Sequence, residues 1–166
     1  MKILVTGANG QLGQDLMRVI VAAGDEAVGI DIDTVDITSR ETVHDALVTI
    51  HPDAVINCAA FTAVDACEDN AETAMLVNGT AVRWVTEASD AVGAHLVHVS
   101  TDYVFDGTKI GPYVETDTPN PQSVYGSTKL AGELEALANG AGVAVVRTSW
   151  VCGFYGNNMV KTVHKL

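Results

Sequence analysis

The chain has 166 residues, of which 48% are hydrophobic and 18% are charged. This balance is typical of one folded domain and excludes a disordered chain. The formal net charge of −12 argues against binding to nucleic acid or to an anionic membrane, because both need a basic protein surface. The sequence therefore predicts a soluble, acidic, cytoplasmic protein.

Short apolar runs of strand length alternate with segments of helical periodicity. The expected strands are residues 2–6, 26–31, 54–60, 94–100 and 143–150. The expected helices are residues 11–24, a segment from Thr38 or Ser39 to His51, a long helix capped by Asn70, and residues 124–140. This order predicts a doubly wound α/β fold of Rossmann type, with a parallel sheet covered on both faces. Ligands of such sheets bind beyond the carboxyl ends of the strands.

Two segments interrupt this pattern. Residues 101–123 form a long connection with three prolines, which is typical of a functional loop such as a lid. Residues 157–166 resemble the start of an amphipathic helix and end without a cap. We therefore interpret residues 1–166 as one NAD(P)-binding domain, the N-terminal part of a longer chain, without a C-terminal substrate-binding domain.

A glycine-rich turn follows the first expected strand and opens the first expected helix. Its sequence, GANGQLG, spaces Gly7, Gly10 and Gly13 as GxxGxxG. Glycines allow a tight turn and a close approach of a pyrophosphate to the backbone, and the helix N-terminus offers free N–H groups. We expect Gly7, Gly10, Gln11, Leu12 and Gly13 to bind the cofactor.

An acidic residue follows the second expected strand. Asp31 lies 18 residues after Gly13, near the spacing of a ribose-binding acid. A carboxylate there would accept hydrogen bonds from the adenosine ribose and repel a 2′-phosphate, so NADH is favoured over NADPH. The alternatives are a solvated turn residue and an offset of this preference by Arg40. Asp36 and Ile37 are expected near the adenine.

Tyr125 and Lys129 are four residues apart and share one face of a predicted helix. Together with the glycine turn, NCAA at residues 57–60 and Thr101 after the fourth strand, they resemble the extended short-chain dehydrogenase/reductase superfamily. The finer resemblance is to the dTDP-4-dehydrorhamnose reductase family, through TGANGQLG, NCAAFTAVDACE, VSTDYVFDG, ETDTPNPQSVYGSTKLAGE and RTSWVCG. It implies an oxidoreductase with NADH or NADPH and a nucleotide-sugar substrate.

The resemblance implies reduction of the C4 ketone of dTDP-4-dehydro-L-rhamnose, a step of dTDP-rhamnose and surface polysaccharide biosynthesis. Tyrosine has an ordinary pKa near 10 and is a proton donor at pH 7, so Tyr125 would be the general acid. Lys129 would lower the pKa of Tyr125 and hold the nicotinamide ribose. Thr101 would bind the substrate carbonyl. By itself, the tyrosine–lysine pair would more often be a surface pair than a catalytic one.

Further site residues come from the same resemblance. Asp102 and Tyr103 would contact the substrate, and Asp102 has the alternative role of a turn cap. Related dehydratases carry a second acid where Tyr103 stands, so elimination is disfavoured. Trp150 would be a wall of the sugar site, or else a core residue. Ala60, Phe61 and Thr62 would line the cofactor, and Asn78 is either a buried polar residue near the site or a plain helix residue.

The sequence predicts no metal site. Cys58, Cys67 and Cys152 form no CxxC pair, and the acidic residues between Asp65 and Glu72 are expected on a solvated helix face. Some family members bind Mg²⁺ at a dimer contact, but no ligand for it maps onto this sequence. The resemblance allows a homodimer.

Two alternatives to this function stay open. One is the non-catalytic, NADP-binding regulatory subunit of methionine adenosyltransferase, which belongs to the same family. The other is a different sugar-nucleotide reductase or epimerase. If residues 1–166 are the whole protein, we expect cofactor binding with little or no turnover.

Overall fold

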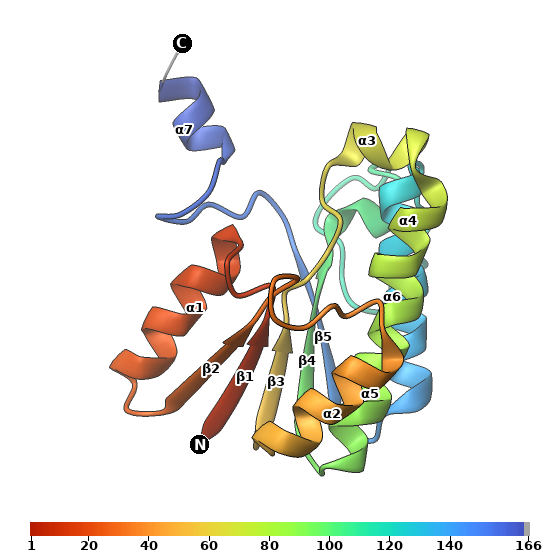
Figure 1. The fold of residues 1–166 in the computed structure, drawn as a ribbon. Coiled ribbons are helices and arrows are strands. Elements are labelled where there is room, and N and C mark those ends of the chain that lie inside the picture. Colours follow the sequence, from red (N-terminus) through yellow and green to blue (C-terminus); the bar gives the residue numbers. More distant parts are fainter. Residues whose placement is uncertain (165–166) are drawn as a thin grey trace.

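The fold is built on a parallel sheet of five strands in the order β2-β1-β3-β4-β5 (Figure 1). A computed structural model describes residues 1–164 of the chain. The strands are β1 (Lys2–Thr6), β2 (Glu26–Ile30), β3 (Ala54–Asn57), β4 (His95–Thr101) and β5 (Val143–Thr148). All neighbours pair in parallel, so the carboxyl ends of the strands meet at one edge, as the strand–helix order predicts.

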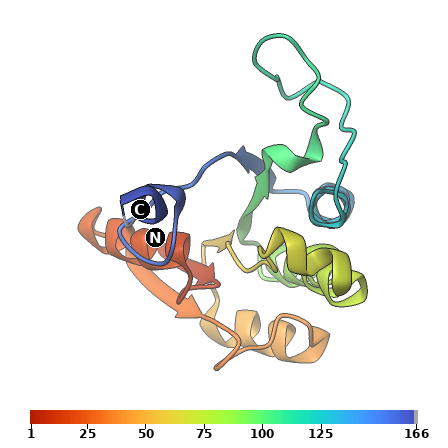
Figure 2. The same cartoon turned by 90° about the horizontal axis from the view of Figure 1, so that it is seen from above.

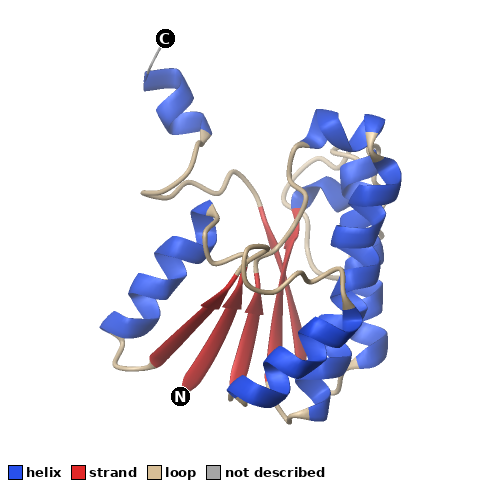
Figure 3. Cartoon of the chain, viewed as in Figure 1, coloured by secondary structure: helices blue, strands red, loops and turns tan. Residues whose placement is uncertain are grey.

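Helices lie on both sides of the sheet (Figures 2 and 3). On one side, α1 (Gln11–Ala22) lies over β1 and β2. On the other side lie α2 (Arg40–Ile50), α5 (Ala81–Ala91) and α6 (Val124–Asn139). The remaining helices are α3 (Val64–Asp69), α4 (Ala71–Met75), the π-helix η1 (Leu76–Thr80), the 3₁₀-helix η2 (Asp102–Val104) and α7 (Met159–His164). No helix among residues 1–164 is both long and apolar enough to cross a bilayer.

The expected elements are present, with differences at their ends. The third strand stops at Asn57 instead of continuing to residue 60, because the chain leaves the sheet there. Ser39 caps α2, and its Oγ accepts a hydrogen bond from the Thr42 N–H. Asn70 does not cap the following helix with its side chain, which instead donates backward to the Ala66 carbonyl. The expected helix at residues 157–166 begins at Met159, and its last two residues lie outside the described part.

The sheet is covered unequally. On the α2–α5 side, Leu4, Val55 and Leu96 belong to one buried cluster, which is the main core and the main hydrophobic contribution to folding. On the other side α1 extends only over β1 and β2, and Val146 of β5 is 43% exposed. Within residues 1–164, the prediction that helices cover both faces of the sheet is therefore correct at β1 and β2. It is wrong at β5, where one face is partly exposed.

A polar chain crosses three strands inside this core. The Thr6 hydroxyl donates to Asn57 Oδ1 at 2.6 Å, and Asn57 Nδ2 lies 3.1 Å from His98 Nδ1. His98 is fully buried. Burial lowers the pKa of His98 to about 3, and the charge of Lys129 acts in the same direction.

Replacing His98 with Gln should make stability less dependent on pH. The pKa of His98 is about 3 in the folded chain and about 6.5 when unfolded. Below pH 6.5 the unfolded chain therefore binds a proton that the folded chain does not, and folding stability falls as pH falls. Between pH 7 and pH 5 this loss is about 2 kcal/mol, and urea unfolding of His98→Gln should lack it. The exposed His44→Gln is the matched control, and an equal acid loss in parent and His98→Gln would contradict the prediction.

Candidate functional site

A cavity of about 900 Å³ opens at the carboxyl ends of the strands. It is bounded by the turn after β1, the segment after β2, the loop after β3, the end of β4, the start of α6 and the segment after β5. All site residues expected from the sequence line it: Gly7, Gly10, Gln11, Leu12, Gly13, Asp31, Asp36, Ile37, Ala60, Phe61, Thr62, Thr101, Asp102, Tyr103, Tyr125, Lys129 and Trp150. Segments more than 100 residues apart in sequence thus meet in one place.

The glycine turn has the shape of a phosphate cradle. Gly7 has a φ of 65°, which L side chains rarely adopt, and a Cβ on Gly13 would lie 2.2 Å from the Gly7 carbonyl oxygen. Gly10 begins α1 without a side-chain cap, and the first turn of α1 has no acid. The N–H groups there stay free for an anion. The tight glycine packing and the uncapped start of α1 together fit a bound dinucleotide.

Asp31 ties the glycine turn to the end of β2. Its Oδ2 accepts from the Asn9 N–H at 2.8 Å and its Oδ1 from the Ile32 N–H at 2.8 Å. A carboxylate has about four acceptor positions, so Asp31 keeps capacity for ribose hydroxyls at the cavity wall. Arg40, which might have offset its charge, pairs with Glu87 at 2.9 Å and does not line the cavity.

The loop after β3 is held in place by Asn78. Asn78 is fully buried in the π-helix η1. Its Oδ1 accepts from the Phe61 N–H at 2.8 Å, and its Nδ2 donates to the Phe61 carbonyl at 3.1 Å and to Thr128 Oγ1 at 3.2 Å. The structure therefore supports the interpretation of Asn78 as a buried polar residue near the site, and not as a plain helix residue. It joins the loop at Ala60–Thr62 to helix α6.

Tyr125 and Lys129 both reach the cavity from α6. Ser123 caps this helix, accepting from the Gly126 N–H. Burial raises the pKa of Tyr125, and the Thr101 hydroxyl acts against this rise. Lys129 is 2% exposed and donates to the Val99 carbonyl at 2.7 Å. The expected lowering of the Tyr125 pKa by Lys129 is not found, since burial is the main cause of the shift and Lys129 is not among its causes. The raised pKa keeps the phenol protonated.

The end of β4 presents Thr101 next to Tyr125. The Thr101 hydroxyl donates to Asp102 Oδ1 at 3.1 Å and accepts from the Tyr103 N–H at 3.2 Å. The other Asp102 oxygen accepts from Ser149 Oγ at 2.7 Å. The Tyr103 ring meets the Tyr125 ring edge to face at 5.5 Å, so these side chains form one wall of the cavity.

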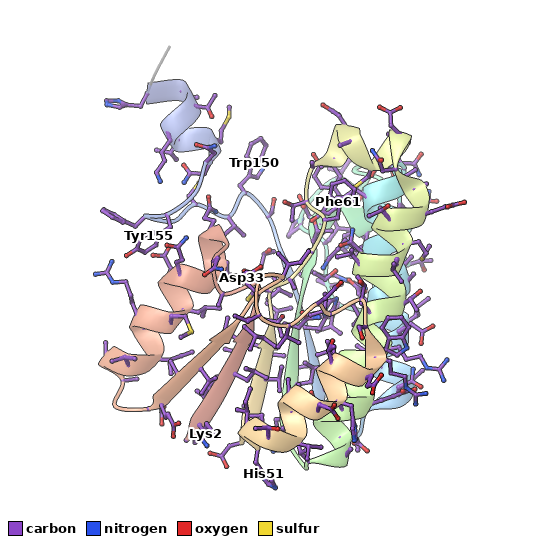
Figure 4. All side chains as sticks on the ribbon, in the orientation of Figure 1. Lys2, Asp33, His51, Phe61, Trp150 and Tyr155 are labelled. Atoms are coloured by element: carbon purple, nitrogen blue, oxygen red, sulfur yellow. The ribbon has the colours of Figure 1, made fainter. Side chains whose placement is uncertain are left out.

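Trp150 lines the cavity from the segment after β5. It is 74% exposed, so the alternative of a core tryptophan is wrong. Its backbone lies in the left-handed region, with a φ of 53°, a conformation that is costly for a bulky residue and is found mainly at functional sites. Figure 4 shows Trp150 and Phe61 at the carboxyl end of the sheet, on segments that follow β5 and β3.

Several cavity residues were not identified from the sequence. Cys58, Val99, Ser100 and Thr148 line the cavity, and no motif spacing marks them. Burial raises the pKa of Cys58 to about 12, against the effect of Lys129, so this thiol is not a nucleophile. Residues 1–164 contain no group of three or more His, Cys, Asp or Glu side chains that could hold a metal ion.

Comparison with known proteins agrees with this geometry. The family described as RmlD substrate binding domain matches residues 1–166. The dTDP-4-dehydrorhamnose reductase of Burkholderia thailandensis is 45% identical over 166 residues, which are all of this chain and 55% of that protein.

Two solved structures show the same fold. The dTDP-4-dehydrorhamnose reductase of Clostridium acetobutylicum has a TM-score of 0.96 at 44% identity, and that of Bacillus anthracis, in complex with NADP, has a TM-score of 0.96 at 40% identity. Each comparison covers 99% of this chain and 59% of the other. The chain thus spans little more than half the length of these relatives, and it belongs to the dTDP-4-dehydrorhamnose reductase family.

Proposed function

We propose that residues 1–166 are the NAD(P)-binding domain of a reductase that converts the C4 ketone of dTDP-4-dehydro-L-rhamnose to dTDP-L-rhamnose. The observation that carries this proposal is that Thr101, Tyr125 and Lys129 line the same cavity as the glycine turn. A nicotinamide cofactor held there would supply hydride. The family membership and the names of the relatives support the reaction and the nucleotide-sugar substrate.

The side chains of this domain have separate tasks in the proposed reaction. Tyr125 donates the phenol proton to the ketone oxygen, and its raised pKa keeps that proton available at neutral pH. Thr101 orients the carbonyl. Lys129, anchored on the Val99 carbonyl, places a positive charge near the cofactor ribose, and Asp102, Tyr103 and Trp150 contact the sugar.

The test is a chimaera in which this chain replaces the matching 55% of the Burkholderia thailandensis reductase. NADH oxidation is followed with a panel of 4-keto sugar nucleotides. We expect turnover with dTDP-4-dehydro-L-rhamnose and much less with other sugars. Binding of NADH without oxidation on any ketone would instead favour a regulatory subunit. Residues 1–166 alone should bind NADH with little or no turnover.

Cofactor preference is expected to depend on Asp31. The parent chain should bind NADH more tightly than NADPH, because the Asp31 carboxylate repels a 2′-phosphate. Asp31→Asn should reduce the ratio of the two dissociation constants about tenfold, or about 1.4 kcal/mol. The ratio is measured by fluorescence titration. Asp33→Asn is the control, since Asp33 is close in sequence but does not line the cavity. An equal effect of both variants would contradict the role of Asp31.

A further inference from the structure

A buried ion pair lies behind the proposed catalytic residues. Glu133 of α6 is 2% exposed. Its Oε2 accepts from Arg147 Nη2 at 2.6 Å, and its Oε1 accepts from Arg147 Nε at 2.9 Å and from Ser100 Oγ at 2.5 Å. Arg147 comes from β5 and Ser100 from β4. One carboxylate therefore joins α6 to two strands, and Figure 1 shows α6 beside them.

The Glu133 carboxylate lies on the same face of α6 as Tyr125 and Lys129. Along α6, Glu133 follows Lys129 by four residues, and Lys129 follows Tyr125 by four, so the three share one helix face. Along β4, Ser100 lies between Val99, whose carbonyl binds Lys129, and Thr101. The Glu133–Ser100 and Lys129–Val99 bonds are thus two adjacent links that set where Thr101 stands relative to Tyr125.

Three titratable side chains interact with the charge of Lys129. Cys58 faces it from the loop after β3, His98 from β4 and Glu133 from its own helix. Burial lowers the pKa of Lys129 to about 8, and Glu133 acts in the opposite direction. His98 is neutral at pH 7 and the Cys58 thiol is protonated, since their pKa values are about 3 and about 12. Glu133, with Arg147 as its partner, is the acid that supports the charge of Lys129.

We propose that Glu133 is a positioning residue of the reductase site, which fixes the end of β4 against α6 through Ser100 and, in balance with Arg147, keeps Lys129 charged. The proposal rests on the proposed function for the roles of Thr101, Tyr125 and Lys129. It adds an electrostatic interaction between Glu133 and Lys129, which can be measured through the pKa of Lys129 without any turnover.

The test is an NMR titration of the 166-residue chain labelled with ¹³C at the lysine ε-carbons. The Lys129 signal is assigned by its loss in Lys129→Met. Glu133→Gln should lower the pKa of Lys129 by about one unit, because it removes a negative charge and leaves Arg147 unbalanced. Arg147→Met should raise it by about one unit, because it leaves Glu133 unbalanced. Amide spectra verify that each variant is folded.

The direction of the shifts separates this role from simple stabilisation. Each single variant breaks the same ion pair, so damage to the fold would move the Lys129 pKa in the same direction in both, or in neither. The double variant Glu133→Gln with Arg147→Met removes both charges and should return the pKa close to the parent value. If one single variant does not fold, the direction of the Lys129 shift in the other single variant decides the test. Shifts of one sign, or an unchanged Lys129 signal, would overturn the proposal.

The chimaera adds a kinetic readout. The alkaline limb of kcat/KM should move to lower pH in Glu133→Gln and to higher pH in Arg147→Met, following the Lys129 titration. An alkaline limb that stays in place while the titration shifts would overturn the positioning role. A chimaera that reduces no ketone would overturn the proposed function, while the titration would still decide the link between Glu133 and Lys129.

Discussion

Replacing Tyr125 with Phe is expected to lower kcat for ketone reduction in the chimaera by about 10³-fold, the usual contribution of a general acid. The variant loses only the hydroxyl and keeps a ring for the edge-to-face contact with Tyr103, so NADH binding should change little. Single-turnover kinetics and a fluorescence titration of NADH measure the two effects separately.

Tyr113→Phe is the matched control for this variant. Its phenol donates to Asp106 in the long loop and lies outside the cavity, so turnover should stay near the parent rate. If Tyr125→Phe kept more than about a tenth of the parent rate, proton donation by Tyr125 would be excluded, because a general acid contributes at least about 10²-fold.

Replacing Gly13 with Ala is expected to weaken NADH binding by about 100-fold or more, which is about 2.8 kcal/mol or more, because the turn that approaches the pyrophosphate must move. The added Cβ would lie 2.2 Å from the Gly7 carbonyl oxygen and 2.7 Å from Ala8 Cα. Both are backbone atoms, so the turn itself must move. Thermal unfolding in parallel distinguishes a displaced turn from an unfolded chain.

Gly10→Ala provides a graded comparison within the same turn. A Cβ on Gly10 would meet the Gly7 oxygen at 3.1 Å, a contact that a small shift relieves. Gly10 also has a negative φ of −73°, so alanine causes no backbone strain there. We expect a much smaller loss of affinity than in Gly13→Ala. Equal losses would show that close packing inside the turn is not what binds the cofactor.

Much of the fold follows from local sequence patterns. Apolar runs such as Lys2–Thr6 mark buried parallel strands, and Ser39 and Ser123 mark helix starts by their capping hydroxyls. The cavity was predictable because each motif follows a strand, and parallel strands end at one edge of the sheet. The proximity of Tyr125 to the glycine turn could thus be predicted from the strand order alone.

Contacts between distant side chains were not predictable in the same way. Glu133 and Arg147 are both charged residues in amphipathic segments, and spacing alone gives no sign that they are paired and largely removed from water. The partial exposure of β5 depends on which strands α1 covers, which is a property of the whole arrangement. The π-helix η1 has no simple sequence signature, because its five residues differ from an α-helix only in hydrogen-bond register.

That π-helix confines the effect of a one-residue deletion in this part of the chain to the position of Asn78. Helices α4, η1 and α5 run without a break from Ala71 to Ala91. Within this run, Asn78 must face Phe61, while Val82 and Val85 must face the core. Deleting one residue from Leu76–Thr80 would convert the wide turn to an ordinary one. That change absorbs the deletion and leaves α4 and α5 close to their present relative orientation, but it would displace Asn78 from Phe61. A deletion in this segment is therefore expected to loosen the loop after β3, which Asn78 holds, and to leave the packing of Val82 and Val85 in the core largely unchanged.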